Sequence, residues 1–358
     1  MADGNELYVL DREFHTIDVV DDYQELIWTD RYYKPGDFEI YTSPESSLLK
    51  SALKDYYIYK RDSEHLMIVE TLEIESDTEL GNHLKITGRS LESILDRRIV
   101  WAQTDLNGNL QNGVKSLLTA AFISPSVADR RIDNFRIEDA TDERITELTM
   151  SNQYTGDNLL EVINTLCESN HIGFKIVRDA DNNFVFSLYV GTDRSYKQNK
   201  VPYVVFSPNF ENIINSNYYN SYEEYKNVAH VGGEGEGTAR TYVNVGTASG
   251  LDRRELYVDA RDLRSEDFPG SQYTIALQNR GKEQLEEYKE KKNFEGEVES
   301  TILYRYGEHF FMGDIVQIAN EYGYEGVARI SEFVTSESNR GRETYPTFEM
   351  VEDKEETS

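Results

Sequence analysis

The chain has 358 residues and a mass of 41.4 kDa, and its 66 Asp and Glu residues exceed its 37 Lys and Arg residues, which gives a formal net charge of −29. This acidity disfavours a reader of duplex DNA or RNA and a protein that binds anionic membrane surfaces, because both need a basic footprint. The 38% hydrophobic and 12% aromatic content disfavours a disordered acidic chain and is sufficient for the cores of two to three domains.

Residues 1–98 are predicted to form a first small β-barrel or curled sheet. Short segments rich in aromatic and β-branched residues are typical of strands, and Pro35, Gly36 and Asp37 form a turn between two of them. One short helix is expected at 46–54, where apolar residues recur at helical spacing. The expected strands span 7–10, 25–28, 38–41, 56–60, 66–75 and 83–87.

Residues 99–199 are predicted to form an α+β insertion domain. The strongest helix signal is 157–168, with Asp157 as its expected N-cap and an apolar stripe behind it. Segments 174–178 and 184–190 predict a hairpin across the acidic turn 179–183. Two further helices are expected at 90–97 and 114–122.

A second, discontinuous β-barrel domain is predicted from 200–246 and 294–350. The segment between them, 247–293, is predicted to be a helical insertion that packs with the α+β domain. Its charged helix, 278–292, can face solvent and places Glu287 and Lys291 four residues apart in the favourable order. The acidic tail 351–358 is expected to be disordered. The strands expected in this half are 203–206, 228–231, 241–245, 297–304, 315–319 and 327–335.

Two distant segments resemble each other. Tyr32-Tyr33 is followed by Gly36-Asp37 and Ile40, and Phe310-Phe311 is followed by Gly313-Asp314 and Ile318. A related strand follows each of them, at 69–74 and 327–333. An aromatic strand end, a Gly-Asp turn and an apolar strand used twice indicate two similar β modules, although a match this short can also arise by chance.

The glycine-rich stretch 232–237 is interpreted as a flexible hairpin connection. It lacks the Gly-Lys-Ser/Thr ending of a phosphate loop, and a strand-like segment follows it where a phosphate loop would have a helix. Glu234 and Glu236 would also repel phosphate.

No constellation of residues points to catalysis or to a metal. Cys167 and His171 lie four apart, but Cys167 lies in an apolar helix stripe and is interpreted as a buried structural thiol. The acidic turns 105–109 and 179–183 begin like calcium loops, yet neither has both the sixth-position Gly and the twelfth-position Glu. The six histidines show no zinc spacing, and no Gly-x-Ser-x-Gly elbow occurs. We therefore predict no catalytic, cofactor-binding or metal-binding residues and no enzyme activity.

The single cysteine excludes an intrachain disulfide and a Cys-rich zinc site. No apolar run approaches the roughly 20 residues that a membrane-spanning helix needs, and the acidic N-terminus lacks the apolar core of a signal peptide. We expect no stable membrane insertion, and a chain that stays in the cytoplasm or leaves it by a route other than secretion.

Four segments together resemble the tail hub proteins, or tail-associated structural proteins, of siphophages and related prophages, which are relatives of the baseplate hub of contractile tails. Residues 26–41 resemble the opening barrel of that family, and 88–98 resemble the passage into its helical part. Residues 225–234 resemble the start of the second barrel, and 311–316 one of its later strands. The order of the four segments, which span nearly the whole chain, carries the resemblance.

The resemblance implies a β-dominated α+β fold with two similar barrel modules and α+β insertions. It also implies a homotrimeric ring at the tail tip, in which three copies present six similar barrels to the sixfold tail and continue the DNA channel. The implied partners are the distal tail protein, the tape measure protein and other tip or fibre proteins, with no sequence-specific nucleic acid. The implied location is the virion tail tip, after assembly in the host cytoplasm.

Longer relatives add a C-terminal peptidase or fibre region, and this sequence stops soon after the predicted second barrel, which favours a purely structural hub. We expect some of the excess carboxylates to line the channel and repel DNA, whereas simple solubility is the alternative explanation of the charge. Two alternative functions are a tail-associated cell-wall hydrolase and a carbohydrate-binding receptor protein that uses the abundant Tyr residues. The strand edges, the 232–237 loop and the 278–292 helix are the expected partner contacts.

Overall fold

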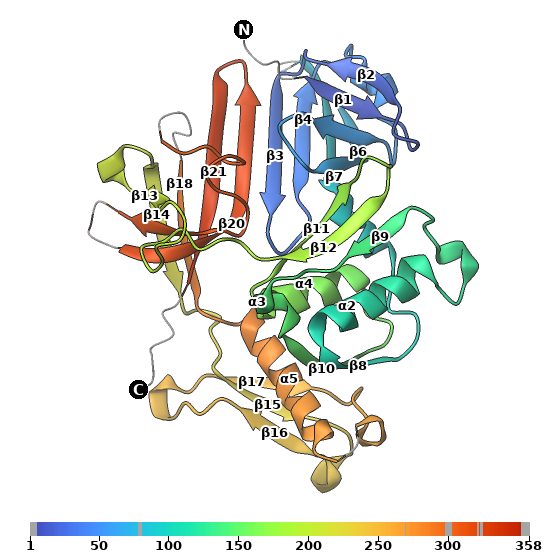
Figure 1. Cartoon of the computed structure of the whole chain (residues 1–358), viewed down its shortest axis with the longest axis vertical. Coiled ribbons are helices and arrows are strands. Elements are labelled where there is room, and N and C mark those ends of the chain that lie inside the picture. Colours follow the sequence, from blue (N-terminus) through green and yellow to red (C-terminus); the bar gives the residue numbers. More distant parts are fainter. Residues whose placement is uncertain are drawn as a thin grey trace.

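The structure is a computed structural model that describes residues 6–77, 81–268, 270–297, 303–320, 322 and 325–351. The predicted tail beyond 351 and part of the predicted strand 297–304 lie outside these residues. Strands dominate the upper half of the molecule, and helices lie below them (Figure 1). The fold is β-dominated α+β, as predicted. The helices are α1 (Leu48–Ser51), η1 (Leu91–Arg97), α2 (Leu110–Leu118), η2 (Thr119–Ile123), η3 (Ala128–Arg130), α3 (Glu143–Thr146), α4 (Leu159–Ser169), η4 (Pro208–Phe210), η5 (Gly237–Ala239), η6 (Gly250–Asp252), η7 (Ser265–Asp267) and α5 (Gln272–Glu287).

Most strands join one 13-stranded sheet, in the order β14-β18-β21-β20-β3-β4-β7-β6-β5-β1-β2, with β19 on β20 and β13 on β19. Its first part consists of β1 (Leu7–Leu10), β2 (Thr16–Val20), β3 (Glu25–Arg31), β4 (Asp37–Thr42), β5 (Tyr57–Lys60), β6 (Leu66–Asp77) and β7 (Gly81–Ser90). Its second part consists of β13 (Val205–Phe206), β14 (Ile214–Ser221), β18 (Lys291–Glu297), β19 (Ile315–Ala319), β20 (Glu325–Ser338) and β21 (Gly341–Met350). We call these parts module 1 and module 2.

The two modules repeat the same five-strand order. Module 1 runs β3-β4-β7-β6-β5, and module 2 runs β14-β18-β21-β20-β19. The long hairpin of each module has a β-bulge at the same place, after Val69 in β6 and after Ile330 in β20. Beyond the bulge, Thr71 pairs with Thr87 and Glu332 pairs with Thr347. The repeat is therefore equivalent residue by residue along the hairpin.

The backbone just before β5 and just before β19 is also the same. The Asp55 amide donates to the Val69 carbonyl, and the Gly313 amide donates to the Ile330 carbonyl, at 3.1 and 2.9 Å. Both donors have positive φ, 62° for Asp55 and 84° for Gly313. Glycine adopts that conformation readily and aspartate tolerates it, so two different residues fill one structural position.

This equivalence corrects the alignment that the sequence suggested. The 310–318 segment corresponds to the segment around Asp55, and not to 32–40. The strand after Gly36 is β4, whose counterpart is β18, because Phe38 pairs with Gly88 and Phe294 pairs with Phe348. The Gly-Asp dipeptide misled the comparison, since a common turn pair recurs without structural equivalence.

One buried cluster of apolar side chains fills each region. The module 1 core includes Trp28 and Phe38, and the module 2 core includes Phe294 and Phe310. A third core lies in the α+β region below module 1 and extends to one face of β5 and β6. That region contains β8 (Thr104–Asn109), β9 (Phe135–Glu138), β10 (Thr149–Tyr154), β11 (Gly173–Arg178) and β12 (Phe184–Tyr189).

The predicted β11–β12 hairpin is confirmed, with Gly173 paired to Tyr189 and Arg178 to Phe184. Helix α4 is also confirmed, but its cap is Asn158, whose side chain accepts bonds from the Leu160 and Glu161 amides. The predicted cap, Asp157, instead accepts from the Thr155 amide. The sequence analysis did not detect β2, β8, β9, β10, β14, β17 or β21, and it placed most of β18 outside its predicted strands.

A separate small sheet lies at the lower end, where α5 packs on it (Figure 1). Its strands are β15 (Val228–Gly232), β16 (Tyr242–Val245) and β17 (Glu255–Asp259), in the order β16-β15-β17. This unit is inserted between β14 and β18, at the position where module 1 has only the short β3–β4 connection. The predicted domain limits stay a prediction, and the pairing places β15 and β16 outside the large sheet.

Helix α5 differs from the expected solvent-facing helix. It spans Gln272–Glu287 and buries Tyr273, Ala276 and Leu277 against the small sheet. Lys291 belongs to β18 and forms its ion pair with Glu224, so the expected helical pair with Glu287 is wrong. The helix begins six residues before the predicted start. Its many charged residues masked the apolar face in the sequence pattern.

Candidate assembly surfaces

The structure separates Cys167 from His171. Cys167 is fully buried in α4, and burial raises the pKa of its thiol far above the usual range. His171 lies beyond the end of α4 with a φ of 54°, so the two side chains do not share a helix face. A buried thiol with a raised pKa is a poor nucleophile, in agreement with a structural role.

The two acidic turns differ in structure. Residues 105–109 form most of β8, which pairs with β10. The 179–183 segment is a tight turn in which Asp179 accepts bonds from the Asp181 and Asn183 amides at 2.9 and 2.8 Å. Within the described ranges, no group of three or more His, Cys, Asp or Glu side chains is arranged to hold a metal ion.

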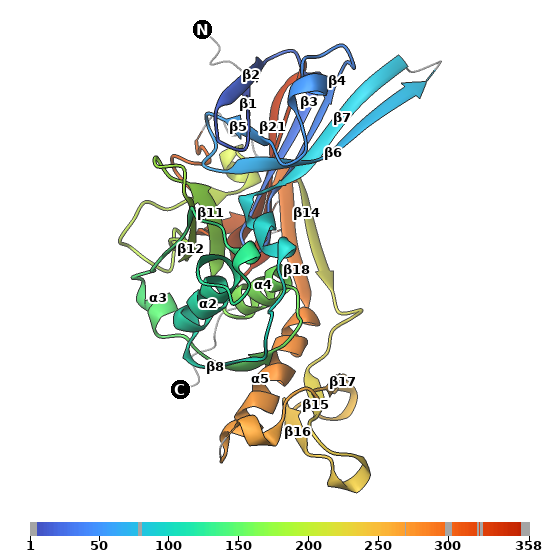
Figure 2. The ribbon, with the colours of Figure 1, turned by 90° about the vertical axis from the view of Figure 1, so that its right-hand side faces the viewer.

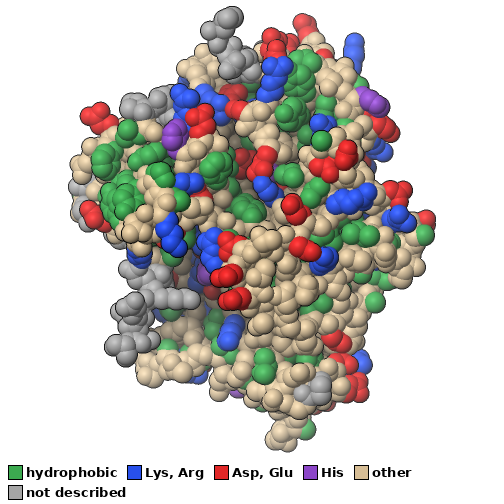
Figure 3. All heavy atoms as spheres, in the orientation of Figure 1, with side chains coloured by type: hydrophobic (Ala, Val, Ile, Leu, Met, Phe, Trp, Pro, Cys, Tyr) green, Lys and Arg blue, Asp and Glu red, His purple; other side chains and the backbone are tan. Residues whose placement is uncertain are grey.

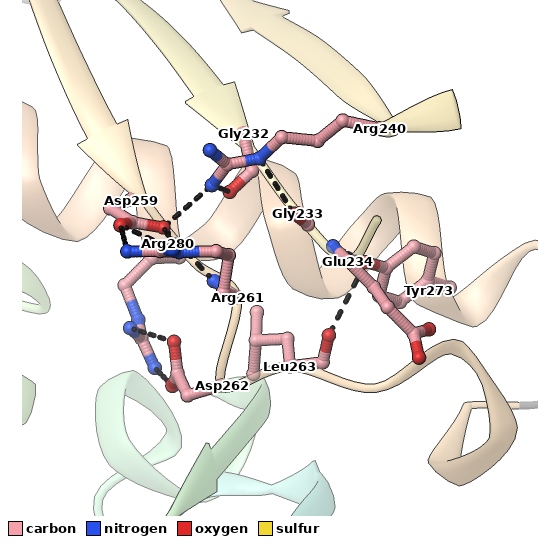
Figure 4. Close-up of polar contacts among 10 residues, drawn as sticks. All are labelled: Gly232, Gly233, Glu234, Arg240, Asp259, Arg261, Asp262, Leu263, Tyr273 and Arg280. Atoms are coloured by element: carbon pink, nitrogen blue, oxygen red, sulfur yellow. Dashed lines mark hydrogen bonds and ion pairs between the residues drawn. The ribbon is translucent and has the colours of Figure 1, made fainter. Parts of the chain in front are cut away.

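The glycine-rich connection between β15 and β16 is held in place by side chains. Arg240 donates to the carbonyls of Gly232 and Gly233 at 2.7 and 2.9 Å and pairs with Asp259 at 2.6 Å (Figure 4). The Tyr273 hydroxyl accepts from the Glu234 amide at 2.7 Å. The hairpin prediction is confirmed. The start of the connection is not flexible as predicted, because these hydrogen bonds hold it in one conformation.

Helix α5 also attaches the small sheet to the α+β region. Glu283 accepts a hydrogen bond from Asn152 of β10. Arg280, one turn earlier on α5, pairs with Asp262 of the small-sheet unit at 2.9 Å (Figure 4). Burial raises the pKa of Glu283 to about 7, even though Arg280 and Asn152 favour the charged form. The contact contains a carboxyl group that titrates near neutral pH.

The two modules meet where β3 pairs antiparallel with β20. Seven residue pairs form this seam, from Arg31 opposite Glu332 to Glu25 opposite Ser338. Arg31 donates to Glu332 at 2.5 Å and also to Asp37, which ties the end of the seam to the start of β4. The seam makes one continuous sheet out of two modules that are far apart in sequence.

A buried ion pair lies beside the seam. Lys60 of module 1 contacts Glu337 of module 2 at 3.1 Å, and their side chains are only 7% and 3% exposed. Tyr23 donates to Glu337 at 3.2 Å, and Lys60 also contacts Asp62 at 3.3 Å. Because a buried charge without its partner is strongly unfavourable, this pair holds the modules in one arrangement.

A second buried cluster joins the seam to the α+β region. His65 lies 3.6 Å from Glu92 of η1 and 4.0 Å from Asp30 of β3, and Glu92 accepts from the Ile176 amide of β11 at 2.8 Å. Burial opposes a charge on the imidazole, but Asp30 and Glu92 raise the pKa of His65 to about 9. Sequence reasoning missed both clusters, because their members are up to 314 residues apart and form no local motif.

Several described stretches of the large sheet have one edge open, β2 at one end of the sheet among them. Among the described strands, β14 pairs with β18 alone, and residues 71–77 of β6 pair with β7 alone. The β6–β7 hairpin extends away from the body of the molecule (Figure 2). It carries the exposed apolar side chains Leu72 and Ile74, and β14 carries the exposed Tyr219. Open edges with apolar side chains are sites for pairing with another chain.

Charge is mixed over the face shown in Figure 3, where acidic and basic side chains lie side by side and apolar ones gather toward the side of β13 and β14. The exposed Tyr196 and Tyr203 contact each other edge to face, with ring centroids 5.3 Å apart.

No helix in the described part of the chain has the length and apolarity needed to cross a membrane.

A cavity of about 260 Å³ lies between module 1 and the α+β region, with Tyr57, Ile68 and Phe184 in its lining. Its one carboxylate, Asp55, pairs with Arg97 at 2.8 Å and Arg12 at 3.1 Å. General acid–base hydrolysis of glycosides uses two carboxyl groups, and this lining supplies one that is already neutralised.

Solved structures similar to this one include three tail proteins, two of them from prophages. The 43 kDa tail protein of prophage MuSo2 from Shewanella oneidensis is 12% identical with a TM-score of 0.62, and the match covers 96% of this chain and 98% of that one. The tail protein from Neisseria meningitidis MC58 is 14% identical with a TM-score of 0.58, over 98% and 97% of the two chains. Prophage tail protein gp18 from Listeria monocytogenes EGD-e is 13% identical with a TM-score of 0.54, over 96% and 94%. At these identities the likeness shows the fold.

No curated protein sequence matches the chain. The sequence profile of a protein family does match it, over residues 6–348, which include both modules and both insertions. The family is described as Siphovirus ReqiPepy6 Gp37-like protein. The chain therefore belongs to this family of siphovirus tail proteins, as the resemblance in its sequence predicted.

Proposed function

We propose that this tail protein is the structural hub of the tail tip, where three copies form a ring. The observation that carries the proposal is the repeat of one five-strand module, with the same hairpin register, twice in each chain. Three chains then supply six equivalent modules to a sixfold tail and a threefold surface to the tip. Such a ring adapts one symmetry to the other without a second protein.

The ring continues the channel through which the genome leaves. The net charge of −29 supports this role, because a wall rich in carboxylates repels DNA phosphates and prevents tight binding. The distal tail protein and the tape measure protein contact the ring on its tail side, and other tip or fibre proteins on the opposite side.

The role is non-enzymatic. In the described part of the chain, the cavity between module 1 and the α+β region offers one ion-paired carboxylate and no acid–base pair. A hydrolase predicts measurable cleavage of cell-wall peptide or glycan, and a receptor-binding protein predicts sugar affinity at exposed rings such as Tyr196 and Tyr203. Assays of cell-wall cleavage and of sugar binding on the purified protein test these two alternatives separately.

Light scattering across a concentration series tests the ring. We expect a mass near three times 41.4 kDa, or a monomer that moves toward this mass as concentration rises, and ring-shaped particles in electron micrographs. A strict monomer at every concentration, with no rings, contradicts the proposal.

A further inference from the structure

The seam inside the chain can be compared with the strand edges that stay open. Within the chain, β3 of module 1 pairs with β20 of module 2. The equivalent strands in the opposite modules are β14 and β6. The outer edges of β14 and of residues 71–77 of β6 are both open in the described residues, whereas β2, which also has an open edge, lies outside the repeated five strands. Each chain therefore contains one complete seam. It also carries, on separate surfaces, the two strands equivalent to those that form this seam.

The equivalence sets the register of the second seam. Trp28 of β3 corresponds to Tyr218 of β14, because Trp28 pairs with Phe38 and Tyr218 pairs with Phe294 at matching positions. Thr335 of β20 corresponds to Ile74 of β6, counted from the bulge. Since Trp28 pairs with Thr335 in the seam, Tyr218 is placed opposite Ile74.

The side chains on β6 fit this role. In the seam, β20 buries Phe333, which packs in the module 2 core, and Thr335, which lies opposite Trp28 of module 1. Their counterparts on β6 are Leu72 and Ile74, which are 39% and 50% exposed in the single chain. Apolar residues therefore occupy the positions that β20 buries, but nothing in the described chain covers them.

Charge also permits the contact. The outer part of β6 carries Glu73, Glu75 and Asp77, and the facing residues 215–221 of β14 contain no carboxylate. Like charges opposite each other destabilise a strand pair, and this register places none together.

We propose that β14 of one subunit pairs antiparallel with residues 71–77 of β6 in the next subunit. Ile74 lies opposite Tyr218, and Glu75 lies opposite Asn217, in the register of the seam between β3 and β20. The contact joins different surfaces of two copies, so it continues around a ring until it closes. The inference rests on the proposed ring and names the edges that form it.

A disulfide across the predicted register tests the inference. In the variant E75C/N217C, directly opposed residues are close enough to bond, and the native Cys167 is buried and does not interfere. We expect oxidation to convert most of the protein to a covalent trimer on a denaturing gel. An equal mixture of the single variants E75C and N217C should stop at a covalent dimer, because each contact is head to tail.

The variant E75C/N220C is the matched control, because Asn220 lies three residues out of register and on the other face of β14. It should give at least tenfold less covalent trimer under the same conditions. A trimer by light scattering that E75C/N217C does not cross-link, or that both pairs cross-link equally, overturns the edge register and leaves the hub proposal standing. A chain that stays monomeric at every concentration, with no cross-linking, overturns both.

Discussion

The β20–β21 hairpin and the β6–β7 hairpin have the same backbone and opposite surroundings. Both have a bulge at the same position and seven residue pairs beyond it. The outer edge of β20 is covered by β3, and a buried Lys60–Glu337 ion pair lies beside it. The outer edge of β6 has no strand beside it in the described chain, and Leu72 and Ile74 face outward. The same pairing pattern thus serves once for folding and, in our proposal, once for assembly.

The largest expected effect comes from Lys60 in the seam. Lys60→Met removes the nearer and more buried cation of Glu337 and leaves only the half-exposed Arg342, 3.6 Å away, so we expect the free energy of unfolding to fall by about 3 kcal/mol in chemical denaturation. The matched control is Lys115→Met, whose partner Asp139 is exposed and whose loss should cost less than about 1 kcal/mol. The double variant K60M/E337L should recover most of the stability. Equal effects of Lys60→Met and Lys115→Met would show that the seam does not depend on this pair.

The second effect is the pH dependence that His65 confers. Because the pKa of His65 is raised to about 9 in the folded chain, its contribution is complete below the unfolded value of about 6.5 and is lost as pH rises through about 9. We expect His65→Gln to remove a pH-dependent stability on the order of 2–3 kcal/mol between these limits. Denaturation curves at pH 6 and pH 9.5 measure it. His15→Gln, at an exposed histidine, should retain the slope of the unaltered chain.

The third effect concerns the open edge. Ile74→Asp should weaken self-association at least tenfold, or about 1.4 kcal/mol, because it places a charge where the proposed contact buries an apolar side chain. The free energy of unfolding of the monomer should change by less than about 0.5 kcal/mol, because the residue is half exposed. Sedimentation across a dilution series measures the association. Ile275→Asp, at a similarly exposed residue on α5, should leave association unchanged, and an equal loss would argue against a specific edge.

The smallest effect is expected at the outer end of the seam. Arg342 of β21 pairs with Asp62 at 2.9 Å, and both side chains are about half exposed. Solvent screens such a pair, and Arg342 is also the more distant cation of buried Glu337, at 3.6 Å against 3.1 Å for Lys60. Arg342→Ala should therefore cost about 1 kcal/mol, less than Lys60→Met. A cost close to that of Lys60→Met would mean that the whole ionic cluster acts as one unit, which a double-mutant cycle of Lys60 and Arg342 would resolve.

Local signals were sufficient for much of the fold. The β11–β12 hairpin is confirmed because strand-forming residues flank a short acidic turn, and both signals lie within 20 residues. Helix α4 is confirmed from its apolar stripe, with its cap displaced by one residue to Asn158. Helix α5 was placed too late, because its charged half dominated the pattern and the buried Tyr273 and Leu277 lay in its less charged first half.

The internal repeat shows a limit of comparing segments by sequence alone. Two similar modules were predicted, but the dipeptide that suggested them aligned the wrong segments. The conserved feature is a positive-φ residue that donates to a bulged strand, and Asp55 and Gly313 both satisfy it. Chemically different residues can adopt that backbone conformation, so the two equivalent positions cannot be matched by residue type.

The sequence by itself determined the fold class, the tail-protein family and most of the individual strands and helices, because these follow from local composition, periodicity and ordered motifs. Only the tertiary structure decided which strand edges are covered and which are open. Lys60 meets Glu337 across 277 residues, and Ile74 and Thr335 occupy equivalent positions with opposite exposure. Whether an edge is covered depends on strands that come together from distant parts of the chain. The pattern of residues along the sequence does not say which of these strands lie side by side in space.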